Sequence, residues 1–179
     1  IVFTETTSNL HHPDFFPGID KMIAPLNEED FKALQPDILL TFGGLVVSKK
    51  IKGFLRTYKP EHHWHIGGQQ ANDTFFCLEE HIKVSVNTFF DKMYADSIVL
   101  KSDYFEKWNQ VKQKFEQKRD LYLKEIPFSD FLAFSEILKS VPNEYMLQLA
   151  NSSTIRYTQL FNFNTTLKVF CNRGTSGID

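Results

Sequence analysis

Short apolar runs alternate with helix-like patterns along almost the whole chain, and this alternation limits the folds that are open to it. The apolar runs read as β-strands at residues 1–3, 37–42, 62–66, 81–86, 145–150 and 167–171. Between them, apolar residues recur at helical spacing at residues 31–34, 48–58, 88–94, 104–125, 128–139 and 154–161. Strands that alternate with helices are typical of parallel sheets with crossover helices. We therefore predict an α/β fold built on a doubly wound parallel sheet.

The longest expected helix carries a single apolar stripe. Its members are Tyr104, Trp108, Val111, Phe115 and Tyr122. Residues at such spacings share one helix face, and lysine and glutamate occupy the other positions, so we expect the stripe to pack into the core. Pro127 ends this helix, and a new helical face begins at Phe128. We therefore expect a domain boundary near residues 124–127.

Composition excludes several classes of function. The 179 residues allow one domain, or one domain and a piece of another. With 42% hydrophobic residues and no apolar run of bilayer length, the chain reads as a globular protein, and no signal peptide or transmembrane segment is expected. Lys+Arg 20 against Asp+Glu 22 leaves no basic excess for nucleic-acid binding. Two distant cysteines, Cys77 and Cys171, favour reduced thiols in a cytoplasmic protein.

The first candidate binding segment follows the strand at 37–42. Gly43 and Gly44 permit a turn, and Ser48 opens a helix whose first residues are Lys49 and Lys50. A helix start with adjacent lysines favours anionic groups. The segment lacks the dinucleotide-binding and P-loop fingerprints. The alternative is that both lysines are simply a solvated first turn.

The second candidate segment follows the strand at 145–150. Asn151 and Ser152 suit a helix N-cap, and Arg156 lies four residues after Ser152 on the same helix side. A serine hydroxyl and an arginine fork together match one carboxylate. The alternative is an ordinary cap with a surface arginine.

The third candidate segment is the terminal loop, where Arg173 follows the strand at 167–171 beside Gly174 and Gly177. Ligands of α/β enzymes bind at the carboxyl ends of strands. Three cationic segments on such turns can converge at one sheet edge. A chain that stops inside this loop is expected to be cut from a longer protein.

Other chemistry finds little support in the sequence. His63 and His65 share a strand face, but no third ligand accompanies them, so we read them as strand-face histidines and predict no metal site. No nucleophile elbow is present, and neither cysteine lies beside a helix-start motif or a paired histidine. We predict no catalytic residue in this chain.

The order and the residues of the three segments resemble those of the MenD family, the 2-succinyl-5-enolpyruvyl-6-hydroxy-3-cyclohexene-1-carboxylate synthases of menaquinone biosynthesis. The segments are Phe42-Gly43 with Ser48-Lys49-Lys50, Asn151-Ser152 with Arg156, and 172–179. The resemblance implies that residues 1–124 form a central, Rossmann-like domain with a parallel sheet flanked by helices. It further implies that residues 125–179 open a second α/β domain, which binds the cofactor diphosphate.

The resemblance also implies a transferase that uses thiamine diphosphate and Mg²⁺ or Mn²⁺ and joins decarboxylated 2-oxoglutarate to isochorismate. Both substrates are dicarboxylates. By the resemblance, Lys49, Lys50, Ser152, Arg156 and Arg173 bind substrate. Many members have glycine, lysine and arginine where this chain has Ser48-Lys49-Lys50, and lysine lacks the bidentate fork of arginine.

For the cofactor, the resemblance assigns Ser176 a backbone carbonyl that accepts from the aminopyrimidine, and Ile178 the apolar support on which the cofactor bends. The activating acid and the magnesium motif fall outside this chain. We therefore expect the fragment alone to be inactive and to hold no cofactor, and the full-length protein to be a cytoplasmic dimer or tetramer.

Two alternatives remain open at the level of sequence. One is another thiamine-dependent decarboxylase or synthase. The polar and cationic set of Ser152, Arg156 and Arg173 argues against those members of this class that act on apolar substrates. The other is a non-catalytic Rossmann-like module that binds a nucleotide and ends naturally at Asp179.

Overall fold

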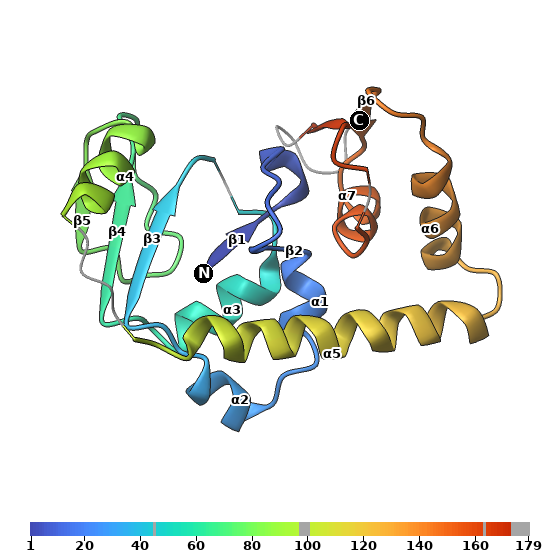
Figure 1. Ribbon diagram of the computed structural model, residues 1–179, viewed down its shortest axis with the longest axis horizontal. Coiled ribbons are helices and arrows are strands. Elements are labelled where there is room, and N and C mark those ends of the chain that lie inside the picture. The colour runs from blue at the N-terminus through green and yellow to red at the C-terminus, as the bar shows by residue number, and fades with distance from the viewer. Residues whose placement is uncertain (45, 97–100, 163, 173–179) are drawn as a thin grey trace. The chain divides into compact units, whose positions relative to one another are not determined.

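The computed structural model describes residues 1–44, 46–96, 101–162 and 164–172, and Figure 1 shows its helices and strands. The chain forms two compact units. One comprises Ile1–Pro25 with Trp108–Asp179, and the other comprises Leu26–Lys107. Every strand pairing among the described residues is parallel. The predicted α/β class, with parallel sheets flanked by helices, is confirmed.

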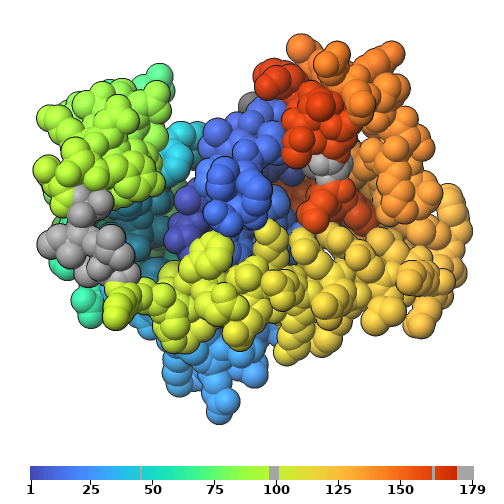
Figure 2. Space-filling model, viewed as in Figure 1, coloured from blue at the N-terminus to red at the C-terminus, as the bar shows by residue number. Residues whose placement is uncertain are grey.

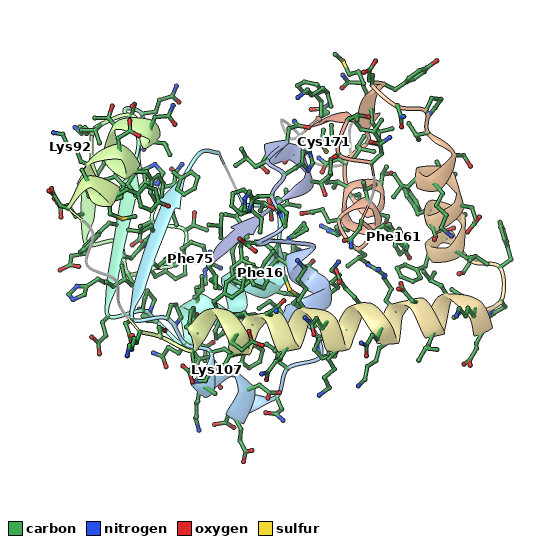
Figure 3. All side chains as sticks on the ribbon, viewed as in Figure 1. Phe16, Phe75, Lys92, Lys107, Phe161 and Cys171 are labelled. Carbon is green, nitrogen blue, oxygen red and sulfur yellow. The ribbon has the colours of Figure 1, made fainter. Side chains whose placement is uncertain are left out.

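The unit of Leu26–Lys107 contains a three-stranded sheet in the order β3-β4-β5. Its strands are β3 Ile38–Phe42, β4 His62–Ile66 and β5 Glu80–Ile82, and its helices are α2 Glu28–Ala33, α3 Lys49–Thr57 and α4 Val86–Ala95. Side chains begin the helices. Ser48 and Ser85 each accept a capping hydrogen bond, at the starts of α3 and α4. The core includes Ile66 and Phe75, of which Figure 3 labels Phe75.

The other unit contains two two-stranded parallel sheets, β1-β2 and β6-β7. Its elements are β1 Val2–Thr4, the 3₁₀ turn η1 Thr6–Ser8, β2 Phe15–Pro17, α1 Ile19–Ile23, α6 Asp130–Ser140, β6 Met146–Leu149, α7 Ser153–Thr158 and β7 Lys168–Cys171, together with most of α5 Tyr104–Glu125. Its core includes Phe16 and Trp108, and the Trp108 ring meets Phe3 edge-on at 4.9 Å between centroids. Within this unit, α5 supports the elements that carry the second candidate segment.

The sequence-based elements agree with the structure in most places and differ in three. A strand was expected over 81–86, but β5 ends at Ile82 and α4 begins at Val86. The elements β2 and α1 were not predicted, because Pro13, Pro17 and Gly18 resemble a loop. The strands form three small sheets in place of one large sheet.

The apolar stripe of α5 was only partly right. Trp108 is fully buried, whereas the Tyr122 side chain is 58% exposed. Helix α5 runs for 22 residues, and its C-terminal part extends beyond the packed strands β1 and β2, so the stripe there meets α6 instead, with 6.1 Å between the Tyr122 and Phe131 rings. The predicted domain boundary near residue 124 stays a prediction. Among the described residues, no helix is both long and apolar enough to cross a membrane.

Candidate functional site

The carboxyl ends of β6 and β7 meet at one edge of their sheet. The two strands are parallel, and the last register pair joins Leu149 to Cys171. The chain leaves β6 towards Ser152 and leaves β7 towards residue 173, so the second and third candidate segments start from neighbouring strand ends. This edge is where α/β proteins bind their ligands.

Ser152 begins α7 in a rare backbone conformation. Its φ is 60° and its ψ is −118°, a region that costs a non-glycine residue about 1–3 kcal/mol. The buried Asn151 supports it, because its Oδ1 accepts a hydrogen bond of 3.0 Å from the Ser152 backbone N–H. Within the described part of the chain, the Ser152 hydroxyl makes no capping hydrogen bond. The exposed hydroxyl therefore remains available to a ligand, which favours the carboxylate interpretation over a plain cap.

Arg156 lies one turn after Ser152 and is exposed. It lines a cleft of about 760 Å³ that α1, α5, α6 and α7 form within one unit. In Figure 2, α6 and α7, coloured orange to red, lie against the yellow helix α5. The cations Lys21, Lys118 and Arg119 also line this cleft, and Asp20 adds one carboxylate to its lining. The rings of Tyr157 and Phe131 form an aromatic wall of the cleft, and their centroids are 6.2 Å apart. Such a cleft suits an anion with an apolar body.

Lys49 and Lys50 occupy the first turn of α3, and both are exposed. The Ser48 hydroxyl, which is buried, accepts a hydrogen bond of 3.1 Å from the Ile51 N–H and so begins the helix. The preceding turn uses Gly43 at a φ of 82°. These lysines belong to the unit of Leu26–Lys107, so their convergence with Ser152 and Arg156 stays a prediction.

The histidines on β4 form a structural network. Thr41 Oγ1 lies 3.0 Å from His63 Nε2 and 3.1 Å from His65 Nδ1. Burial lowers the pKa of both imidazoles, and the neighbouring His81 lowers that of His65 further. Across the described residues, no three His, Cys, Asp or Glu side chains are grouped to hold a metal ion. Neutral, hydrogen-bonded imidazoles fit the expected role of strand-face histidines.

The whole chain aligns with curated proteins described as 2-succinyl-5-enolpyruvyl-6-hydroxy-3-cyclohexene-1-carboxylate synthase. Identity is 49% over 179 residues with the protein of Flavobacterium johnsoniae and 52% over 184 residues with that of Christiangramia forsetii, in both cases over 100% of the chain and 32% of the relative. The protein of Porphyromonas gingivalis is 32% identical over 190 residues. The chain is homologous to a segment of this synthase. The resemblance drawn from the sequence is thereby confirmed.

The chain spans about one third of the length of the curated synthases it matches. No profile of a known protein family matches it. Of the residues that the resemblance assigns to the synthase site, Arg173, Ser176 and Ile178 lie outside the described residues. The roles of all the assigned residues stay predictions.

Two residues of the Arg156 cleft were missed by sequence reasoning. Lys21 on α1 and Arg119 on α5 both line it. A signal for Arg119 exists in the sequence, because Lys112, Glu116 and Arg119 recur at spacings of four and three along α5. The sequence holds no comparable signal for Lys21, because α1 was not predicted.

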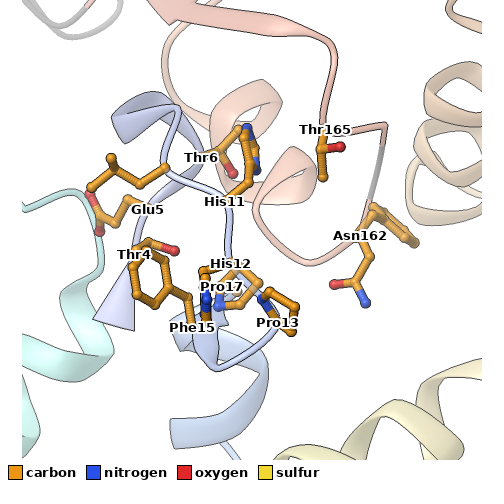
Figure 4. A pocket seen from close by; sticks show the side chains of 13 residues that line it. Thr4, Glu5, Thr6, His11, His12, Pro13, Phe15, Pro17, Asn162 and Thr165 are labelled. Carbon is orange, nitrogen blue, oxygen red and sulfur yellow. The ribbon is translucent and has the colours of Figure 1, made fainter. Parts of the chain in front are cut away.

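A second cavity, of about 460 Å³, lies in the same unit and is shown in Figure 4. His11 and His12 line it from the loop before β2, and Asn162 and Thr165 line it from the chain after α7. Apolar atoms form most of its surface.

Proposed function

We propose that the full-length protein containing this segment is a 2-succinyl-5-enolpyruvyl-6-hydroxy-3-cyclohexene-1-carboxylate synthase, and that this segment supplies substrate-binding residues. The reaction joins a decarboxylated 2-oxoglutarate unit to isochorismate in menaquinone biosynthesis. The observation that carries the proposal is the 49–52% identity to such synthases along the whole chain, combined with the exposed Ser152 just after the end of β6 and the exposed Arg156 one helical turn later.

Thiamine diphosphate, when bound, supplies a nucleophilic carbon and an electron sink. The fit of this segment to the cofactor rests on the strand register, because β7 ends at Cys171 beside Leu149 of β6, and Ser176 and Ile178 follow that strand end in the sequence. We expect Mg²⁺ or Mn²⁺ and the diphosphate to be held by the rest of the full-length chain. The segment alone is expected to be inactive, because a closed site needs the remaining domains to exclude water.

Within this function, the chain's own groups bind and orient dicarboxylates. The Arg156 guanidinium can donate two parallel hydrogen bonds to one carboxylate. The Ser152 hydroxyl, one helical turn earlier, can donate a third. Lys49, Lys50 and Arg173 are proposed to add cationic contacts. A cytoplasmic enzyme that works as a dimer or tetramer is part of the same proposal.

The decisive experiment measures carbon dioxide release by the full-length protein from 2-oxoglutarate with isochorismate, thiamine diphosphate and magnesium. Arg156→Ala is expected to lower kcat/KM by about 10- to 100-fold, since hydrogen bonds to a charged group contribute about 1.5–3 kcal/mol. Arg156→Lys keeps the charge but loses the fork, so we expect it to recover only part of the activity.

Lys139→Ala is the matched control, because Lys139 is an exposed cation on α6 whose partner is Glu136. Its kcat/KM is expected to equal that of the wild type. An inert wild type would refute the proposed function. An Arg156→Ala variant as active as Lys139→Ala would remove Arg156 from the substrate site.

A further inference from the structure

Three polar side chains from distant parts of the chain form a closed network beside the Arg156 cleft. Lys21 Nζ lies 3.3 Å from Glu116 Oε1 and donates to Asn162 Oδ1 at 2.9 Å, and Asn162 Nδ2 donates to Glu116 Oε1 at 3.1 Å. The Lys21 side chain is 8% exposed and that of Glu116 is 24% exposed. We call this set the Lys21 network. It joins α1, α5 and Asn162, which lies four residues after the end of α7.

Helix α5 extends this network along one face. Lys112, Glu116 and Arg119 share that face because they are four and three residues apart. Lys112 Nζ donates to the Phe15 carbonyl at 3.2 Å, and Arg119 Nη1 donates to the Leu160 carbonyl at 3.4 Å. The helix therefore holds β2, α1 and the end of α7 with three successive polar side chains.

The end of α7 is continuous with Arg156. Backbone hydrogen bonds run from the Gln159 N–H to the Ile155 carbonyl at 3.1 Å and from the Leu160 N–H to the Tyr157 carbonyl at 2.9 Å. A helical turn thus connects Arg156 to the anchored Leu160, and the second anchored residue, Asn162, lies two positions further along the chain. Movement of those anchors would rotate or shift α7, and the Arg156 side chain with it.

Holding a helix through a buried ammonium group costs desolvation free energy. Burial, and after it the nearby Arg119, together lower the pKa of Lys21 to about 8, although Glu116 opposes this shift. Burial raises the pKa of Glu116, but Asn162 and Lys21 outweigh it and hold that pKa below its ordinary value. An apolar contact would hold two helices together with less desolvation. A directional charge network is favoured where the placement of a helix matters.

We propose that Lys21 is a positioning residue of the synthase, which sets α7 through Glu116 and Asn162 so that Arg156 meets a substrate carboxylate. This inference rests on the proposed function. Lys21 acts through α7 and need not touch the substrate.

The charged groups that face Lys21 all lie on α5, where Lys112 and Arg119 repel it and Glu116 attracts it. Because the folded-state pKa is depressed, Lys21 is charged below about pH 8 and loses its charge above it. The folded state binds fewer protons than the unfolded state between that pH and the ordinary lysine pKa, so this group's contribution to stability rises with pH there. Substrate affinity should fall over the same range, because the network loses its cation.

The test uses the full-length synthase and compares the wild type with Lys21→Arg, Lys21→Met and the double variant Lys21→Met with Glu116→Met. The double variant replaces the ion pair by apolar side chains of similar length, which usually preserves folding. We expect it to keep its Tm and to raise the KM for at least one dicarboxylate substrate by about 10-fold, since small misplacements of a binding group are costly. The value of kcat should change far less. Lys114→Met, an exposed position on α5, is the control and should match the wild type.

The pH profile provides a second readout that a purely structural role would not move. The wild-type KM should rise above about pH 8, whereas Lys21→Arg should stay level because arginine keeps its charge. An active wild type whose KM and pH profile are unchanged in the double variant and in Lys21→Arg would overturn this inference alone. An inert wild type would instead refute the proposed function, so the two failures are distinguishable.

Discussion

Gly18 shows how a single residue sets the approach of two helices. It precedes α1 with a φ of 72°, and a Cβ at this position would lie 2.8 Å from the Gln159 carbonyl oxygen, just past the end of α7. The obstacle is backbone, so it cannot rotate away as a side chain can. Only glycine combines this conformation with this approach.

We expect Gly18→Ala to lower the free energy of unfolding by about 1–3 kcal/mol, measured by urea denaturation, because a positive φ and a steric conflict act together. Gly53→Ala is the matched control. Gly53 lies inside α3 with no atom within 4 Å of an added Cβ. Alanine there should instead stabilise the fold by about 0.5–1 kcal/mol. Equal effects at the two positions would contradict this account.

At the scale of elements, α3 and α7 begin with the same residue type used in opposite ways. At α3, Ser48 has a φ of −56° and its hydroxyl caps the helix. At α7, Ser152 has a φ of 60° and makes no capping bond within the described residues. The first serine stabilises its helix, whereas the second holds strain at the candidate substrate site.

The same substitution at these two positions should therefore change stability with opposite signs. Ser152→Gly is expected to raise the free energy of unfolding by about 1 kcal/mol by relieving the positive φ. It is also expected to lower kcat/KM of the full-length protein in the proposed reaction by removing a hydroxyl. Ser48→Gly should lower the free energy of unfolding by a few tenths of a kcal/mol or more, because it removes the cap. Thermal unfolding and steady-state kinetics on one set of variants measure both effects. A Ser152→Gly variant that loses stability would show that no strain is held there.

At the scale of the whole molecule, each compact unit has its own core. Ile66 on β4 is fully buried in the unit of Leu26–Lys107, and Leu167 beside β7 is fully buried in the other. The first unit contains the β3-β4-β5 sheet, and the second contains the β1-β2 and β6-β7 sheets. Their stabilities should therefore respond separately to local damage.

We expect Ile66→Ala and Leu167→Ala each to cost about 2–5 kcal/mol of local stability through lost burial and a residual cavity. Hydrogen exchange should accelerate in β3, β4 and β5 for the first variant and in β6 and β7 for the second. An exposed substitution such as Lys32→Ala on α2 should leave exchange unchanged. Uniform acceleration across both units in either variant would show a single cooperative core.

The sequence alone determined the elements whose signals are local. The apolar spacing around Trp108 predicted the bounds of α5 exactly as Tyr104–Glu125 has them, and the apolar runs predicted β3, β4, β6 and β7 to within one or two residues. Local chemistry also predicted the helix starts at Ser48 and Ser152. These features depend on residues that are a few positions apart, so they can be predicted from the sequence alone.

Tertiary structure decided what depends on residues far apart. Strand β2 is defined by its pairing with β1, and Pro17 makes this segment resemble a loop when only neighbouring residues are considered. The Lys21 network joins residues that are 95 and 141 positions apart, and only packing brings them together. The same packing placed Ser152 in a strained conformation that no local propensity favours. Long-range burial outweighs local preference at these positions, because the free energy of packing a core exceeds the few kcal/mol that a strained residue or a buried charge costs.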